Sequence, residues 1–171
     1  GNGARGLNAY QVSEAGQNEI THIEEGANIM RPPPPPDASR IDRTKADVAI
    51  NRNSAEAQKA ISFLKTHGTV IDPTIAIYEF FTATTTNPPA VFEPGVTKVA
   101  PEVAKQLTDV GPPSERSELM GKFFQKGLSI IGALHLAGIP IVACPDQTSL
   151  GCSLDRRLAL VVQAGRPTKP S

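Results

Sequence analysis

Two short stretches of the chain that we expect to form strands each end in, or are followed by, a residue that can bind a proton or a metal ion. The first stretch, "NEITHI" (18–23), alternates in the manner of a strand and ends in His22 and Ile23. The second, "IPIVAC", is wholly apolar and runs through Cys144 to Asp146. A lone carboxylate directly after a buried strand can act on a bound group or cap a loop. The residues by themselves leave both roles open for Asp146, and His22 is equally compatible with a surface or core histidine.

The two cysteines, Cys144 and Cys152, have the wrong spacing for a common zinc knuckle. Two thiols also do not make a disulfide framework, and pairing them would require their Cα atoms to approach within roughly 6 Å. We therefore expect plain thiols, one of them buried.

Composition narrows the class of protein. With 171 residues and 18.1 kDa, of which 39% are hydrophobic and 20% charged, the chain fits one soluble domain with a real core. Seventeen basic residues balance 17 acidic ones, so we expect no nucleic-acid partner and no anionic membrane surface. No apolar run approaches the roughly 18–20 residues of a membrane helix, and "GNGARGLN" is no signal peptide. The missing initial Met leaves the compartment undecided.

Periodicity and turn residues predict alternating helices and strands in one domain over 1–171. We expect helices at 8–15, 53–68, 101–111, 114–138 and 153–165, strands at 18–23, 69–74 and 139–144, a Pro-rich connector at 31–52, a surface loop at 82–97 and a tail at 166–171. Such alternation indicates an α/β fold with a parallel sheet and crossover helices. A doubly wound domain and a piece of a (β/α)8 TIM barrel both fit.

Local signals position these elements. Asn53 and Glu56 have the spacing of a capping box, and Gly68 ends the helix that they begin. Five consecutive prolines after Arg31 favour an extended, stiff connector, with a docking site for a proline-binding module as the alternative.

Three segments together resemble a known family. "AGQNEITHI", "FLKTHGTVIDPTIAIYE" and "LHLAGIPIVACPDQTSLGCSLDRRLALVVQAG" are similar to the amidohydrolase superfamily, in its imidazolonepropionase-like and Xaa-Pro-dipeptidase-like branch. The resemblance covers nearly the whole chain and is weakest from 31 to 52. It implies a partial (β/α)8 barrel, comprising strands 6 to 8 with their helices, whose site gathers at the carboxyl ends of the strands.

The resemblance also implies a chemistry and two site residues. In the family one or two divalent cations, usually zinc, acidify a bound water, and the resulting hydroxide hydrolyses a C–N bond in an amide, cyclic amide or dipeptide-like substrate. Asp146 matches the carboxylate that touches the metal and takes the proton from that water. His22 matches the histidine ligand at the end of the sixth strand.

Departures from the family pattern are equally informative. The His-x-His pair of the first strand and the acidic ligand of the fourth are absent from this chain, and Asn2 replaces the histidine of the fifth. The usual Gly-Thr-Asp reads Cys-Pro-Asp, and Cys152, Asp155 and Arg157 stand where relatives line the pocket with histidines and a glutamate. Two ligands cannot hold catalytic zinc, which takes three protein ligands plus water.

Other polar residues receive structural roles. His67 and His135 lie at helix ends on the face opposite the expected site, so we do not assign them to it. Asp72 and Glu79 follow the seventh strand, where we expect a solvated loop role rather than a place in a pocket.

Three functional classes follow. The first is a fragment or degenerate relative of a metal-dependent amidohydrolase, inactive as an isolated chain and possessing zinc, another divalent cation, or no metal at all. The second is a non-catalytic structural or interaction protein built on a half-barrel, which associates through its open sheet edges as a homo-oligomer or with a missing N-terminal half. The third is a small doubly wound domain that binds a ligand at the strand ends without a metal, and a nucleotide found at the turn at 1–6 would favour it.

Overall fold

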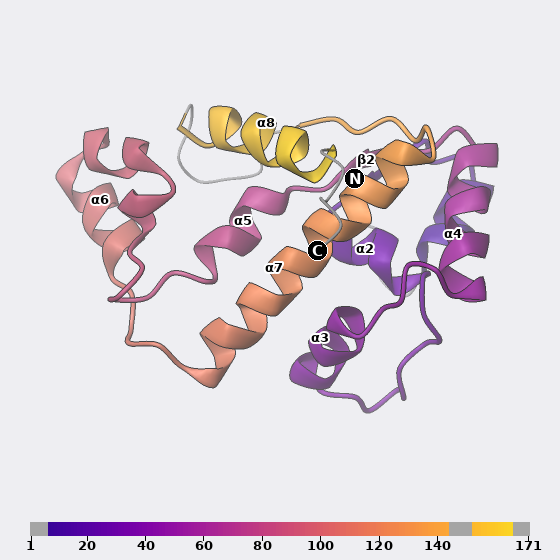
Figure 1. The fold of residues 1–171 in the computed structure, drawn as a ribbon, viewed down its shortest axis with the longest axis horizontal. Coiled ribbons are helices and arrows are strands. Elements are labelled where there is room, and N and C mark those ends of the chain that lie inside the picture. Colours follow the sequence, from indigo (N-terminus) through magenta and orange to yellow (C-terminus); the bar gives the residue numbers. More distant parts are fainter. Residues whose placement is uncertain (1–6, 144–151, 166–171) are drawn as a thin grey trace, which may run out of the picture.

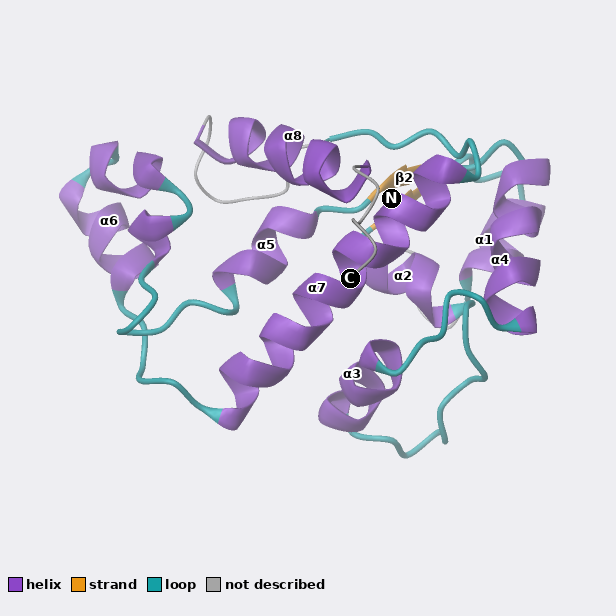
Figure 2. Cartoon of the chain, in the orientation of Figure 1, coloured by secondary structure: helices purple, strands orange, loops and turns teal. Residues whose placement is uncertain are grey.

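The computed structural model describes residues 7–143 and 152–165. The described chain is a mixed α/β protein, mostly helical, with two short parallel strands (Figures 1 and 2). The expectations for Asn2, Cys144, Asp146, the turn at 1–6 and the tail at 166–171 lie outside the described residues. The general α/β class predicted from the sequence is confirmed.

Apart from the strand expected at 139–144, the elements follow one another in the predicted order, with additional short helices between them. They are α1 (Ala9–Glu14), β1 (Glu19–Thr21), α2 (Ile23–Asn28), α3 (Arg40–Val48), α4 (Ala55–Thr66), β2 (Val70–Asp72), α5 (Ile75–Phe80), the 3-10 helices η1 (Pro89–Val91) and η2 (Pro94–Lys98), α6 (Pro101–Thr108), α7 (Glu115–Leu136) and α8 (Cys152–Gly165).

The sheet runs through the middle of the fold. β1 pairs with β2 in parallel, with Ile20 opposite Ile71, and both side chains are buried. On the other side of β2, Ile71 forms a parallel bridge with Ile141. Three chain segments therefore run side by side in the order 19–21, 70–72, 141. A parallel pair needs a crossover connection, and here α3 and α4 lie in the connection between the strands.

The long helix α7 crosses the centre of the molecule and contacts α2, α3, α5 and α8 (Figure 1). Ser114 caps its first turn by accepting the backbone N–H of Ser117 at 3.2 Å. Its buried apolar side chains are Phe123, Phe124, Leu128, Ile130, Ile131 and Leu134. Burial on this scale supplies most of the stability of such a helix, because isolated helices are marginal in water.

A glycine lets α8 approach α7 closely. A Cβ atom added to Gly132 of α7 would collide with the backbone carbonyl oxygen of Ala164 of α8. Backbone atoms cannot swing away as side chains do, so the contact requires glycine at this position. The last helix predicted from the sequence is thus confirmed, and it is packed against the core through Leu160, which is fully buried.

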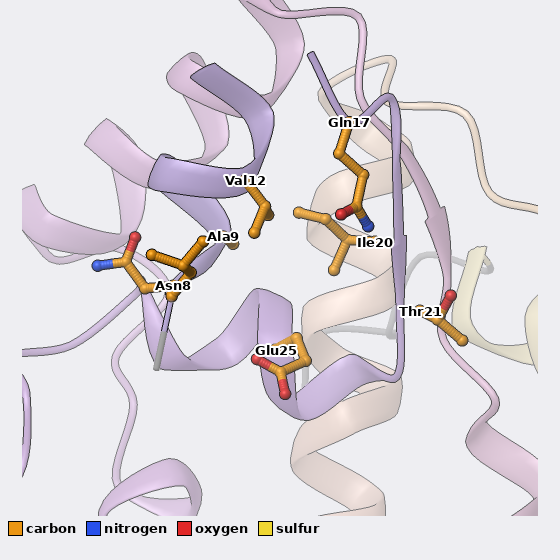
Figure 3. A pocket seen from close by; sticks show the side chains of 8 residues that line it. Asn8, Ala9, Val12, Gln17, Ile20, Thr21 and Glu25 are labelled. Atoms are coloured by element: carbon orange, nitrogen blue, oxygen red, sulfur yellow. The ribbon is translucent and has the colours of Figure 1, made fainter. Parts of the chain in front are cut away.

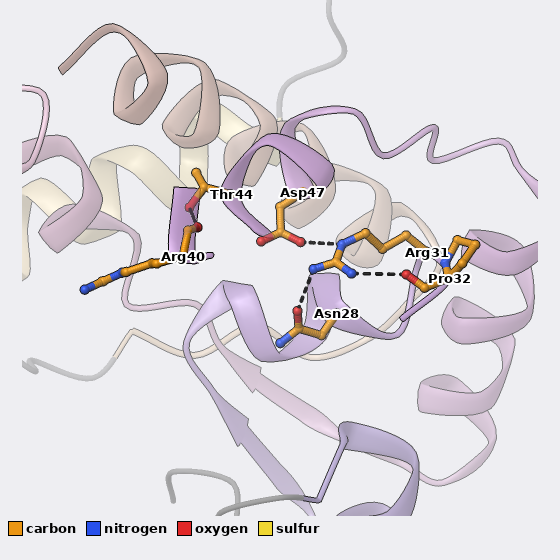
Figure 4. Close-up of polar contacts among 6 residues, drawn as sticks. All are labelled: Asn28, Arg31, Pro32, Arg40, Thr44 and Asp47. Carbon is orange, nitrogen blue, oxygen red and sulfur yellow. Dashed lines mark hydrogen bonds and ion pairs between the residues drawn. The ribbon is translucent and has the colours of Figure 1, made fainter. Parts of the chain in front are cut away.

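The Pro-rich connector contains a helix that the sequence analysis did not predict. α3 is capped by Ser39, whose hydroxyl accepts the N–H of Asp42 at 3.1 Å. Before it, the guanidinium of Arg31 donates to Asp47 at 2.6 Å and to Asn28 and the Pro32 carbonyl at 3.1 Å each (Figure 4). Asp47 lies in α3, so this ion pair fixes both ends of the connector.

Three local predictions need correction. The N-cap of α4 is Ser54, which accepts the N–H of Ala57, rather than Asn53. The loop expected at 82–97 includes the two 3-10 helices. The apolar stretch 139–143 forms one bridge and no full strand in the described residues, and Val142 is 40% exposed. That exposure contradicts a strand buried on both faces.

No helix within the described ranges is long and apolar enough to cross a membrane.

Candidate functional site

The carboxyl ends of β1 and β2 bring polar side chains from two distant parts of the sequence together. His22 follows β1 directly, and its backbone N–H donates to the carbonyl of Asp72, the last residue of β2, at 2.8 Å. Its ring Nδ1 lies 2.7 Å from the hydroxyl oxygen of Thr74. Parallel strands end at the same edge of a sheet, so this meeting follows from the register of the strands.

Two residues at this edge have backbone conformations that favour glycine. His22 has φ of 71° and Thr74 has φ of 42°, and they are the only non-glycine residues in the described chain with positive φ. Thr74 is β-branched, for which this conformation is a genuine outlier. Such conformations cost about 1–3 kcal/mol each and cluster at functional sites. The hydrogen bond between the two side chains holds them in place.

Asp72 is buried, with 2% of its surface exposed. One carboxylate oxygen accepts the backbone N–H of Thr74 at 3.3 Å. Glu79, in α5, is 7% exposed. The solvated loop role expected for both carboxylates is therefore wrong: each lies in the interior of the protein, where α5 follows β2 after only two residues, Pro73 and Thr74.

A hydrogen bond between α2 and α5 stabilises the carboxyl edge of the sheet. Tyr78 of α5 donates its hydroxyl to Glu24 of α2 at 2.7 Å. Burial is the main cause that raises the pKa of Tyr78, and the neighbouring Glu24 carboxylate adds to it. The phenol therefore stays protonated and keeps donating. This hydrogen bond joins α2, which follows β1, to α5, which follows β2.

An ion pair attaches α8 to the same region. Arg156 donates from Nε and Nη2 to the two carboxylate oxygens of Glu79, at 2.7 and 2.5 Å. This two-pronged geometry is the strong form of an arginine–carboxylate contact. The hydrogen bond with Glu79 is the principal cause of the raised pKa of Arg156. Sequence reasoning missed this pair, because the two residues are 77 positions apart and no spacing rule connects them.

The residues that the sequence resemblance aligned with the family's pocket residues lie in different environments. Arg157 is buried, with 1% exposed, whereas Asp155 is exposed. The side chain of Cys152 lies outside the described residues. His67 and His135 are exposed at the ends of α4 and α7, as predicted, and His67 stacks on Phe63 with ring centroids 3.9 Å apart.

The described residues do not make a complete metal site. Residues 7–143 and 152–165 contain no group of three or more His, Cys, Asp or Glu side chains that could hold an ion. At the carboxyl edge, His22 and Asp72 are the residues of suitable type that the strands bring together. Catalytic zinc takes three protein ligands. Within the described ranges, this edge therefore shows fewer than the three ligands of a catalytic zinc.

A small hollow on the outer side of β1 is too narrow for a substrate. Figure 3 shows that it lies between α1, α2 and β1, with the side chains of Val12 and Ile20 facing each other. Its volume of about 10 Å³ leaves room for about one water molecule. Burial and the neighbouring Glu24 raise the pKa of Glu25, which is consistent with a partly enclosed carboxyl group.

Comparisons with protein-family models, curated proteins and solved structures find no match for this chain.

Proposed function

We propose that this chain supplies strands 6 to 8, with their helices, of a metal-dependent barrel of the amidohydrolase type. The observation that carries the proposal is the meeting of His22 and Asp72 at the carboxyl ends of two neighbouring parallel strands. Ile141 adds a third parallel segment on the far side of β2. In a (β/α)8 barrel the active site lies at this end of the strands. The activity of the complete barrel would be hydrolysis of a C–N bond in an amide or dipeptide-like substrate.

The roles of the residues follow from their positions. A histidine that binds a metal is usually oriented by a hydrogen bond to its other ring nitrogen. The contact from His22 Nδ1 to Thr74 supports such a role, since it fixes the ring at the edge of the sheet. Asp146 is the proposed partner ligand and proton acceptor. It follows the segment at 141 in the sequence, outside the described residues.

The chain alone is proposed to be inactive. His22 and Asp146 are two ligands, whereas catalytic zinc takes three protein ligands plus water. Asp72 is not counted as the third, because one of its carboxylate oxygens accepts the backbone N–H of Thr74. Zinc, or another divalent cation, would then be bound weakly, and catalysis would require ligands from further barrel strands.

A second function is favoured by the outer edge of β1. In the described part of the chain, β1 has β2 as its single strand neighbour. The amide of Gln17 donates to the Glu19 carbonyl at 2.6 Å and satisfies part of that edge. An open edge is a template for another strand. The protein would then be a non-catalytic half-barrel that pairs with a second copy or with an N-terminal half.

Zinc titration of the metal-free protein tests the first proposal. We expect binding weaker than about 1 μM, further weakened by His22→Ala and by Asp146→Asn, and no hydrolysis of dipeptide substrates. The matched control is His67→Ala, which removes an exposed histidine at the end of α4 and should change nothing.

Two results would overturn parts of this account. Stoichiometric submicromolar zinc binding together with hydrolysis would contradict the inactive chain. Weak zinc binding that survives both substitutions would remove His22 and Asp146 from any metal site. The mass of the same samples in solution addresses the second function, for which a monomer is the contrary result.

A further inference from the structure

The five prolines that follow Arg31 form an extended segment on the rim of the molecule. Residues 32–35 belong to no helix or strand, and Figure 2 shows the loop that enters α3 running along the edge of the fold. The proline ring fixes φ at about −65°, and each residue that precedes a proline is restricted to extended backbone. The run therefore adopts the left-handed polyproline II helix, which has three residues per turn.

The exposure of the run repeats with the same period of three. Pro32 and Pro33 are exposed, Pro34 is half-buried, and Pro35 and Pro36 are exposed again. In a helix with three residues per turn, residues i and i+3 share a face. Pro34 therefore lies on the face turned toward the protein. The pairs Pro32/Pro35 and Pro33/Pro36 form the two faces that are open to solvent.

A hollow of about 440 Å³ separates part of the run from helices α1 and α2. Pro33, Pro34 and Pro36 line it on one side. Pro32 and Pro35 do not line it, so their face is directed away from the protein. The hollow leaves open space beside the second exposed face. A partner can therefore reach two neighbouring faces of the polyproline helix without displacing any helix of the protein.

Hydrogen bonds hold both ends of the run in place. At the beginning, the guanidinium of Arg31 donates to the Pro32 carbonyl at 3.1 Å, and its ion pair with Asp47 attaches it to α3 (Figure 4). At the other end, Arg43 donates to the Pro36 carbonyl at 3.3 Å. A partner that binds the run meets a segment that is already ordered, so the association loses little conformational entropy.

The middle of the run offers two hydrogen-bond acceptors. The Pro35 carbonyl accepts the backbone N–H of Ala38 at 3.0 Å, whereas no described residue donates to the carbonyl of Pro33 or Pro34. Proline has no N–H, so the run offers acceptors and no donors. A complementary surface therefore combines aromatic rings, which pack against the proline rings, with donors such as a tyrosine hydroxyl or a tryptophan indole N–H.

We propose that the run at 32–36 is the docking site for a domain that binds polyproline II helices in an aromatic-lined groove. SH3 and WW domains are of this kind, and they exploit the preformed, low-entropy helix of their ligands. The two exposed faces, the fixed ends and the open carbonyls are the features that such a groove reads. The inference is independent of the proposed metal chemistry, because the run lies outside the carboxyl edge of the sheet.

Fluorescence titration of the full 171-residue chain against one SH3 domain and one WW domain tests the docking site. The chain contains no tryptophan, so the tryptophan in the groove of each domain reports binding without interference. We expect at least one of the two domains to bind with a Kd below about 1 mM. A free decaproline peptide in excess should displace the chain, because it occupies the same groove.

Two variants within the run and one control complete the test. Pro34→Ala, on the inward face, should weaken binding about threefold, because the backbone of the unbound run becomes less restricted. Pro35→Ala should weaken it about tenfold, because it also removes a ring that packs in the groove. The control is Pro113→Ala, which changes an exposed proline in the loop before α7 and should have no effect. Circular dichroism checks that each variant is folded.

The contrary results are equally definite. Absence of binding to both domains at millimolar concentration, binding that decaproline does not displace, or full affinity in folded Pro35→Ala would each overturn the inference. Equal losses in Pro34→Ala and Pro35→Ala would contradict the assignment of the exposed faces. Failure of zinc binding, by contrast, would overturn the metal proposal and leave the docking result unaffected.

Discussion

Replacing Arg31 by methionine should lower the free energy of unfolding by about 3–5 kcal/mol at pH 7. The side chains of Arg31 and Asp47 are 7% and 8% exposed, and their atoms meet at 2.6 Å. Without Arg31 the Asp47 carboxylate would remain buried and lose its counter-ion. Chemical denaturation monitored by circular dichroism measures the change.

The loss caused by Arg31→Met should become smaller at lower pH. Burial raises the pKa of Asp47, and Arg31 opposes that rise. Removing Arg31 therefore raises the pKa further. A carboxyl group with a raised pKa in the folded state contributes stability below its unfolded pKa and loses that contribution as pH rises through the folded value. The variant should consequently recover part of its stability on going from pH 7 to pH 5.

Two further proteins make the Arg31 result specific. The double variant Arg31→Met/Asp47→Leu should recover most of the lost stability, because no buried charge remains. Arg52→Met removes an exposed arginine with one 3.3 Å hydrogen bond to Ser129 and should cost less than about 1 kcal/mol. An equal loss in Arg31→Met and Arg52→Met would show that the ion pair does not anchor the connector.

Replacing Gly132 by valine should separate α8 from α7. The first atom of the new side chain would lie 2.4 Å from the Ala164 carbonyl oxygen, closer than real Cβ atoms approach another atom. We expect a loss of about 1–3 kcal/mol from overpacking alone. Because α8 carries Arg156, its separation should also break the ion pair with Glu79. Hydrogen exchange should show faster exchange of the amides of α8 than of those in the centre of α7.

Gly121→Val is the matched control on the same helix. An added Cβ at Gly121 meets no atom within 4 Å, so the two variants share the helix-propensity cost of valine and differ in the collision. Equal losses of stability in the two variants would contradict the close approach of α8 to α7.

The parts of the fold that depend on local patterns were predictable. The alternation in 18–23 predicted β1, and the apolar periodicity of 114–138 predicted α7. α3 was missed because its residues are mostly polar, although Ser39 and Asp42 have a helix-start spacing. The bounds of β1 and β2 are shorter than the predicted strands, because the pairing extends over three residues in each.

The candidate site was predictable only in part. The position of His22 after a strand follows from the sequence, but its contact with Thr74, 52 positions away, depends on the register between the two strands. Glu79 and Glu93 were missed as buried groups because acidic residues are usually exposed, and their burial depends on α8 and η2 folding over them. The amidohydrolase relationship itself remains a prediction.

The central claim is that His22 and Asp146 face one cation at the carboxyl edge of the sheet. A crystal structure of the protein soaked with zinc tests it most directly. Ligand bonds to zinc of about 2.0–2.2 Å require the bound nitrogen and oxygen atoms to lie within about 4 Å of each other. We predict a zinc ion between the His22 ring and the Asp146 carboxylate. Zinc bound elsewhere, with these two side chains at opposite ends of the sheet, would contradict the claim.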